Sequence, residues 1–196
     1  WETTSLTGDD FYFAAQNISK GAIIKNEVLA VNTETKNTTV QRTFTEVTEE
    51  NRKKATALLT EGHTAYNESN HAKAIELYSQ AIQINPNYDE AYYWRASAKY
   101  TQKKYKEAIP DYDKAIALNP NSEEAYYYRA LTNYNLDAYT AALPDFDRAI
   151  ELNPDVASMH YWRGDVKYML KQYEEAIIDF SKSLELSRNN DEPSFN

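Results

Sequence analysis

Pairs of neighbouring aromatic residues recur along this chain at a fixed interval, and they are the residues best suited to binding chemistry. Each pair lies 34 residues after the one before it. Tyrosine and tryptophan supply a large rigid contact area and one polar group each, which is why they dominate the energetics of binding surfaces. The spacing therefore predicts rows of aromatic contacts for another molecule. The pairs are Tyr93-Trp94, Tyr127-Tyr128 and Tyr161-Trp162.

Arginine and aspartate recur together at the same interval. Both are missing one interval earlier, where Glu61 and Leu77 stand instead. A guanidinium group can meet a carboxylate through two parallel hydrogen bonds, so the joint appearance indicates structural ion pairs between helices or between neighbouring repeats. Anion binding by the arginines is the alternative. The residues concerned are Arg95, Arg129, Arg163, Asp111, Asp145 and Asp179.

Residues that could carry out catalysis are sparse. The histidines His63, His71 and His160 fall at unrelated points of the interval, and the chain has four glycines and no cysteine. Thiol catalysis, disulfides and thiolate metal sites are thereby excluded, and glycine loops for cradling phosphate could hardly be built. We expect no enzyme, no cofactor and no metal site, and we expect His160 to pack in the core.

The composition narrows the choice of partners. The chain has 196 residues, a net charge of -9 and 13% aromatic residues. Nucleic acid is not expected as a partner, because phosphate binding needs a cationic surface. With a mean hydropathy of -0.76, no apolar run approaches the roughly 20 residues that a membrane span requires. The chain begins with Trp1 rather than methionine, so we expect a processed or excised fragment.

A strict repeat positions all these residues. Asn85-Pro86, Asn119-Pro120 and Asn153-Pro154 also stand 34 residues apart, a period typical of stacked helical repeats. Each proline ends a helix because it cannot donate to the helical ladder. We predict eight helices in four antiparallel pairs over residues 48–187. Small residues recur where paired helices approach, at Gly62, Ala96, Ala130 and Gly164 and at Ala74, Ala108, Ala142 and Ala176.

These repeats resemble the tetratricopeptide repeat family over roughly residues 49–188. The matching stretches include EGHTAYNESNHAKAIELYSQAIQINP and YYRALTNYNLDAYTAALPDFDRAIELNP, in which small, aromatic and proline positions recur in register. The resemblance implies an all-α fold, a right-handed superhelical α-solenoid of stacked antiparallel helix pairs that binds other proteins. The chain departs from the family pattern at its fourth repeat, where Arg188 replaces the proline.

The resemblance also implies that the first helix of each pair lines a concave groove. Trp94 and Trp162 are the best candidates for contact with a ligand. A purely structural role is the alternative for the aromatic pairs. For the tyrosines Tyr66, Tyr100, Tyr134 and Tyr168, packing of helix against helix is the favoured explanation and contact with a ligand is the alternative. The full set expected in a peptide-binding groove is Tyr93, Trp94, Tyr100, Tyr127, Tyr128, Tyr134, Tyr161, Trp162, Tyr168, His63, Glu90, Glu124 and Asp165.

One subclass of the family grips acidic C-termini through a carboxylate clamp of lysine, asparagine and arginine side chains. The matching positions of this chain do not hold those residues, and the charged groove members are acidic. We therefore expect an apolar or basic segment of another protein as the partner. The residues at the clamp positions are Leu59, His63, Trp94, Glu124 and Tyr128.

The sequence divides into three parts: a non-repeat segment at 1–47, the repeats at 48–188 and a flexible tail at 189–196. Two β-branched runs within 27–44 favour a β-hairpin. Segment 1–47 is a cap over the first repeat, a remainder of an upstream domain or a disordered leader. No polar capping helix follows the eighth helix, although repeat arrays generally need one. The alternative function is therefore assembly into a homo-oligomer through this uncapped end.

Overall fold

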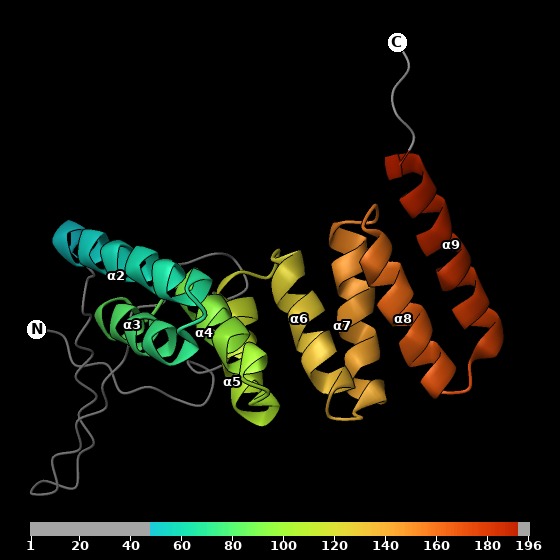
Figure 1. Cartoon of the computed structure of the whole chain (residues 1–196), viewed down its shortest axis with the longest axis horizontal. Coiled ribbons are helices and arrows are strands. Elements are labelled where there is room, and N and C mark those ends of the chain that lie inside the picture. Colours follow the sequence, from blue (N-terminus) through green and yellow to red (C-terminus); the bar gives the residue numbers. More distant parts are fainter. Residues whose placement is uncertain (1–47, 192–196) are drawn as a thin grey trace, which may run out of the picture. The chain divides into compact units, whose positions relative to one another are not determined.

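The computed structural model describes residues 48–191, with side chains up to 188, and the fold below refers to this part of the chain. Within it all regular structure is α-helical, and the helices stack in consecutive antiparallel pairs (Figure 1). This confirms the predicted all-α solenoid. The predicted hairpin and the rest of segment 1–47 lie outside the described residues.

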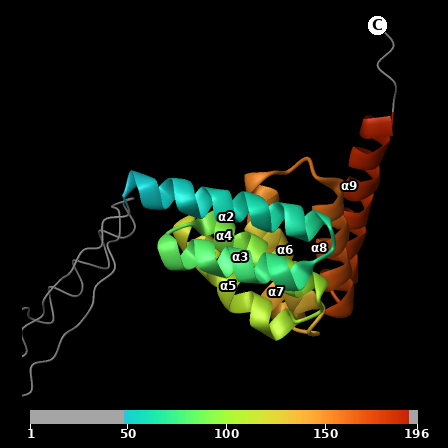
Figure 2. The same cartoon turned by 60° about the vertical axis from the view of Figure 1, so that its left-hand side comes forward.

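The helices follow one another as the 34-residue period predicts. Each packs against the next along the chain, and α6 also contacts α4 and α8, so that first helices of successive pairs touch each other (Figures 1 and 2). The helices are α2 (Glu49–Asn67), α3 (His71–Ile84), α4 (Asp89–Thr101), α5 (Tyr105–Leu118), α6 (Glu123–Tyr134), α7 (Tyr139–Leu152), α8 (Ala157–Met169) and α9 (Tyr173–Asp191).

Helix α9 is longer than predicted. It continues through 189–191, which the sequence analysis assigned to the flexible tail. The reason is the missing proline: Arg188 stands where the other repeats have proline, so nothing removes a donor from the helical ladder at that point.

The turn inside each pair has the same backbone form in all four repeats. Ser69, Lys103, Asp137 and Lys171 adopt the left-handed conformation, with φ between 57° and 63°. The amide of the following residue bonds back over five residues, as Lys104 N does to Lys99 O at 2.9 Å. This arrangement is the Schellman motif, in which glycine is the usual left-handed residue. None of the four positions is glycine, so each turn carries some backbone strain.

The core of each pair is built from small residues against one large ring. Ala74, Ala108 and Ala142 are fully buried, beside the fully buried rings of Tyr78 and Phe146. At Gly62 a Cβ atom would lie 2.4 Å from Tyr78 Cε1, so only glycine allows α2 to approach α3 this closely. The small and aromatic positions of the repeat therefore set the distance between paired helices.

Arginine side chains join three helices at a time. Arg129 of α6 donates from Nε and Nη2 to both carboxylate oxygens of Asp145 in α7, at 2.8 and 2.6 Å. Its Nη1 donates to Asp113 in α5 of the preceding pair, at 2.6 Å. Arg95 and Arg163 make the equivalent bonds to Asp111 and Asp179, and their Nη1 groups reach back to Ser79 and Asp147. We call this three-helix contact the arginine clamp.

The clamp is partly buried, and the charges stabilise each other. The hydrogen bond to Asp145 is the main reason why the pKa of the Arg129 guanidinium is raised above its usual value, against the effect of burial. At Asp179, burial alone would raise the carboxyl pKa. Hydrogen bonds from Arg163 and Lys167 outweigh burial and hold the pKa of Asp179 below its usual value. Lys167 Nζ lies 2.8 Å from Asp179 Oδ2.

Replacing Lys103 by glycine is expected to stabilise the array. Glycine adopts the left-handed conformation without steric cost, and this gain exceeds the extra chain entropy of the unfolded state by about 0.5–1 kcal/mol. The matched control is Lys114→Gly in the middle of α5, which should destabilise by roughly 1 kcal/mol because glycine is a poor helix former. Urea unfolding of both variants measures the difference, and equal effects would contradict a strained turn at Lys103.

Removing the clamp at one repeat should cost far more than removing a surface ion pair. Arg129→Gln leaves the carboxylate of Asp145 buried without its guanidinium, and we expect a loss of about 2–4 kcal/mol in the free energy of unfolding. Arg148→Gln removes an exposed pair with Glu151 within one helix and should leave stability unchanged within error. Thermal and urea unfolding of the two variants provide the test, and similar stabilities would contradict the clamp's role.

Candidate functional site

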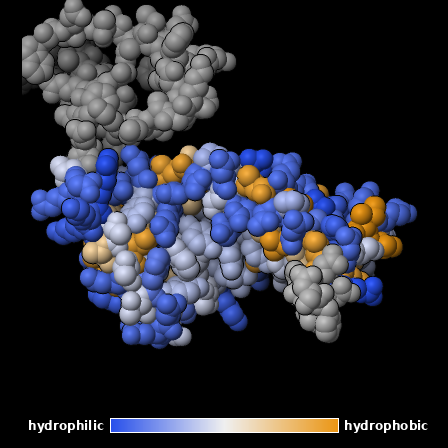
Figure 3. Space-filling view, turned by 90° about the horizontal axis from the view of Figure 1, so that it is seen from above, coloured by the Kyte–Doolittle hydropathy of each residue, from blue (hydrophilic) through white to orange (hydrophobic). Residues whose placement is uncertain are grey.

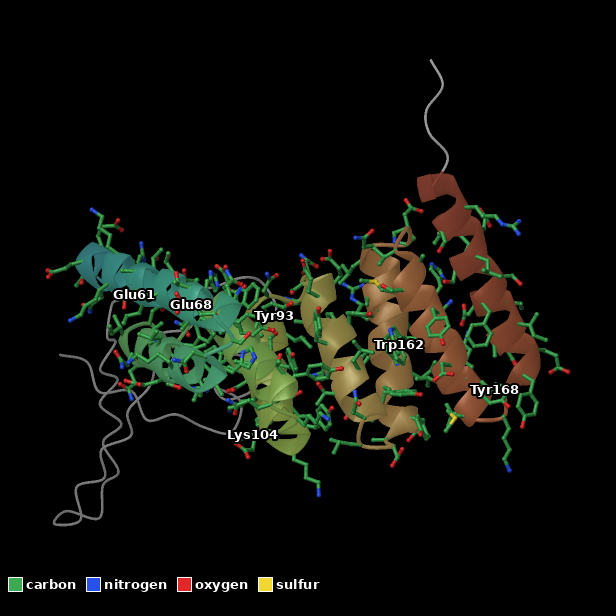
Figure 4. All side chains as sticks on the ribbon, in the orientation of Figure 1. Glu61, Glu68, Tyr93, Lys104, Trp162 and Tyr168 are labelled. Atoms are coloured by element: carbon green, nitrogen blue, oxygen red, sulfur yellow. The ribbon has the colours of Figure 1, made fainter. Side chains whose placement is uncertain are left out.

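The predicted site residues all lie on the first helices of the pairs, and most of their rings contact one another edge-on. These helices are α2, α4, α6 and α8, and α6 also contacts α4 and α8. We call this set of rings the aromatic row. Tyr93 and Trp162 are labelled in Figure 4. The row consists of Tyr66, Tyr93, Trp94, Tyr100, Tyr127, Tyr128, Tyr134, Tyr161, Trp162 and Tyr168.

One contact of the row repeats across every junction between helix pairs. The ring that closes one first helix packs edge-on against the second ring of the aromatic pair in the next first helix. The ring centroids lie 5.2–6.0 Å apart in the three contacts, Tyr66–Trp94, Tyr100–Tyr128 and Tyr134–Trp162. Edge-to-face geometry at this distance is favourable beyond simple burial. The tyrosines of this column therefore join neighbouring repeats, and they also remain part of the surface.

The rings of the row are only partly buried. Trp94 and Trp162 are half-buried, so neither is withdrawn into the repeat core. Tyr161 and Tyr168 are more open, at 48% and 55% exposure, because no further repeat is described beyond α9 to cover them. Half-buried rings held by edge contacts present a rigid apolar surface, which costs little entropy to bind against.

A second set of rings, which was not predicted from the sequence, packs against the aromatic row. His71, Tyr105, Tyr139 and Tyr173 begin the second helices, and each packs against the tyrosine of the row in its own pair, with centroids 5.0–5.5 Å apart. Their 34-residue spacing was visible in the sequence. Only the structure shows which rings they touch.

Acidic side chains accompany the row, but they are not equivalent. Glu90 and Glu124 are exposed in the first turns of α4 and α6. Asp165 accepts a hydrogen bond from the Tyr134 hydroxyl, and this bond is the main reason why the pKa of Tyr134 is raised to about 12. Asp165 is therefore already engaged within the protein, and Glu90 and Glu124 are the acids available to a ligand.

His63 lies at the start of the row, with its ring 4.6 Å from that of Trp94 and 5.8 Å from that of Tyr78. Its Nε2 atom is buried without a hydrogen-bond partner. Burial lowers the pKa of His63, and the nearby Glu90 carboxylate opposes this only in part. The imidazole is therefore neutral at pH 7 and behaves as one more apolar ring of the row.

His160 has a structural role. It is buried at 6% exposure, and its Nε2 atom donates to the backbone carbonyl of Pro154 at 2.8 Å. Tyr92 makes the corresponding contact two repeats earlier, where its hydroxyl donates to Pro86 O at 3.3 Å. The side chain at this repeat position therefore hydrogen-bonds the first helix to the turn that precedes it.

A shallow hollow of about 400 Å³ lies at the turn between α4 and α5, beside Tyr105, whose ring packs against Tyr100 of the aromatic row. Lysine stems and the turn itself form it, and it is open to solvent, so we assign it no role. Within the described chain no group of acidic and histidine side chains is arranged to hold a metal ion. None of the described helices is long and apolar enough to cross a membrane. The hollow is lined by Lys103, Lys104, Tyr105, Lys106, Glu107 and Leu136.

The comparisons with known proteins agree with this architecture. The tetratricopeptide repeat model matches residues 59–123, 93–151 and 129–191, which together cover most of the chain. The chain therefore belongs to the tetratricopeptide repeat family. Proteins of this family are generally interaction modules rather than enzymes. The search of curated proteins found no match.

Several solved structures share the fold. MamA from Desulfovibrio magneticus RS-1 is 22% identical with a TM-score of 0.66, covering 70% of this chain and 78% of its own. YrrB, described as having an unusual peptide-binding site, is 22% identical with a TM-score of 0.65, covering 70% and 71%. The first repeat domain of Spaghetti (RPAP3), bound to the HSP90 peptide SRMEEVD, is 26% identical with a TM-score of 0.60, covering 61% and 95%.

Acidification is expected to protonate His63 and weaken the fold. Because burial keeps the folded-state pKa below the unfolded value of about 6.5, the unfolded chain takes up the proton first as pH falls. The free energy of unfolding should therefore decrease as pH falls below about 6.5. The imidazole proton resonances of His63, assigned with His63→Gln, should titrate with a midpoint below 6.5. A midpoint above 6.5 would contradict this environment.

Proposed function

We propose that the repeat array binds an extended segment of a partner protein along the aromatic row, and that this segment carries apolar and basic residues. The observation that carries the proposal is the set of mostly half-buried rings on the first helices, which pack edge-on across each junction between pairs, with Glu90 and Glu124 exposed beside them. Such rings can hold apolar side chains and the stems of lysine or arginine, whose charged ends then meet the carboxylates. The array acts as a binding scaffold and not as an enzyme.

The likeness to peptide-binding neighbours supports the mode of binding. Two of the similar structures are described with a peptide-binding site or a bound peptide. The peptide in the RPAP3 structure contains the sequence EEVD and is acidic. The positions of this chain that match a carboxylate clamp hold the buried Leu59, the unprotonated His63 and the exposed acid Glu124. We therefore propose the opposite charge preference for this chain.

Aromatic rings of the row should determine affinity. With random-peptide display on the full chain, we expect enrichment of peptides with basic and apolar residues. Trp162→Ala and Tyr128→Ala should each lower the affinity for the selected peptides roughly 5- to 150-fold, as expected for a hot spot worth about 1–3 kcal/mol. Tyr126→Ala is the matched control, since Tyr126 stands on the same helix but stacks with Arg129 at 5.8 Å, on the clamp side.

The exposed acids should determine the charge preference. Glu90→Gln together with Glu124→Gln should lower the affinity for basic peptides. It should also make the association rate less dependent on salt, because electrostatic steering by the carboxylates is lost. Glu107→Gln together with Glu175→Gln, on α5 and α9, serves as the control with the same change in net charge. Enrichment of acidic peptides, or equal effects of the control variants, would overturn the proposed binding mode.

A further inference from the structure

The outer face of α9 stands apart from the rest of the described surface. All of the large hydrophobic side chains exposed in residues 48–188 lie between Tyr161 and Leu184. Ile177, Ile178 and Leu184 are 64%, 67% and 63% exposed. The space-filling view shows hydrophobic side chains gathered at the α9 end of the repeats (Figure 3), and Figure 2 shows α9 at the edge of the helical array.

Repeat positions explain why this face is apolar. Ile177 corresponds to Ile75 and Leu143, and Leu184 corresponds to Ile82 and Ile150, in the earlier repeats. In those repeats the next first helix covers the residues that correspond to Leu184: Ile82 packs with Ala91 and Ile150 with Met159, and both isoleucines are only 9% exposed. In α9 the same positions have kept their apolar side chains, although no further helix of the described chain packs on them. Such a face resembles an interface and not an ordinary surface.

The opposite end of the array cannot supply the missing helix. The residues of α2 that would face a preceding repeat are polar or small, and Thr56, Thr60 and Thr64 turn their hydroxyls back to their own helix, onto carbonyls four residues earlier. Glu61 stands where the other first helices carry the clamp arginine. Glu61 and Glu68 lie along α2 in Figure 4. A second copy stacked head to tail would thus bring a carboxylate, not a guanidinium, to α9, and no clamp would form.

The face of α9 is instead complementary to itself. Seven residues form one stripe at helical spacing around Ser181, namely Glu174, Ile177, Ile178, Ser181, Leu184, Glu185 and Arg188. All seven are exposed. The acidic residue Glu174 lies seven positions before Ser181, and the basic residue Arg188 lies seven positions after it. The charged and apolar residues of the stripe are therefore arranged almost symmetrically about the small Ser181.

We infer that a second copy of this chain covers the α9 stripe, with the two α9 helices antiparallel and crossing at Ser181. In this arrangement a two-fold axis places Ile178 level with Leu184 of the second copy, Ile177 level with Glu185, and Glu174 level with Arg188. The small Ser181 lies at the crossing point and allows close approach. The interface is isologous, so it closes as a dimer and leaves both arrays free to bind partners through their aromatic rows.

The main test is the oligomeric state of the full chain over a range of concentrations, by sedimentation or light scattering. We expect a dimer that dissociates on dilution. Ile178→Lys should raise the dissociation constant by about 10-fold or more, because it buries a charge against Leu184. Ile177→Lys, the same substitution at the adjacent and equally exposed position, should leave the dimer intact, because its neighbour across the axis is Glu185. A monomer at all concentrations, or equal effects of the two variants, would overturn the inference.

Two further experiments define the geometry. Arg188→Glu should weaken the dimer, and combining it with Glu174→Arg should restore it, because the charge pairs are exchanged across the axis. The chain has no cysteine, so Ser181→Cys introduces a single thiol close to its own copy. It should oxidise to a disulfide-linked dimer much faster than Ser187→Cys, which is exposed on another side of α9. Equal rates, or a double variant no better than Arg188→Glu, would contradict the antiparallel crossing.

Discussion

The arginine clamp is the contact on which the rest of the array depends. A single guanidinium group has hydrogen bonds enough for two carboxylates, and Arg129 and Arg163 use them on two different second helices. One of these belongs to the arginine's own pair and the other to the pair before it. Each clamp therefore fixes the fold of a repeat and its stacking on the previous repeat at the same time. Partial burial strengthens the charge-assisted hydrogen bonds. The guanidinium group stays paired because one carboxylate of its own helix pair and one of the preceding pair both accept from it.

Fixing the stacking also fixes the aromatic row. The contacts Tyr100–Tyr128 and Tyr134–Trp162 run across the same junctions that the clamps hold, but on the other side of the first helices. The rings consequently have the packing role that the sequence left open, because they contribute to the cohesion between repeats. Most of them also remain half-buried at the surface that we propose for binding. A binding surface of this kind is pre-organised, because the scaffold and not the ligand orders the side chains.

Much of the fold could be predicted from the sequence because each structural feature of the repeat occurs several times in the chain. Helix ends, core alanines and the companion aromatic at Tyr78, Tyr112 and Phe146 recur in register, so chance agreement is excluded. The repeat also revealed that arginine and aspartate belong together. It did not reveal Asp113 and Asp147 as the other halves of the clamps, because periodicity gives a residue's place in its own repeat and not the offset of the neighbouring repeat. That offset is a result of tertiary packing.

The same limit applies to the site. Spacing identified the aromatic pairs, but only contacts distinguish Asp165, which accepts a bond from Tyr134, from the exposed Glu90 and Glu124. The helix ending in Asp191 is a related case, since an absent proline is a weaker signal than a present one. Predictions from the repeat were most reliable where every repeat agreed, and least reliable where one repeat differed from the others.

The differences between repeats are concentrated at the two ends, and they give the array a direction. The first repeat has Glu61 and Leu77 in place of the clamp arginine and its aspartate, and its outer helix face is polar. The last repeat keeps a complete internal clamp between Arg163 and Asp179, and Ser181 stands at the repeat position of Ser79, which accepts a hydrogen bond from Arg95. Only the change in the first repeat removes chemistry needed to add another repeat. Only the α9 end keeps the apolar side chains of a junction, so the array is closed to further stacking at its start and suited to a different kind of contact at its end.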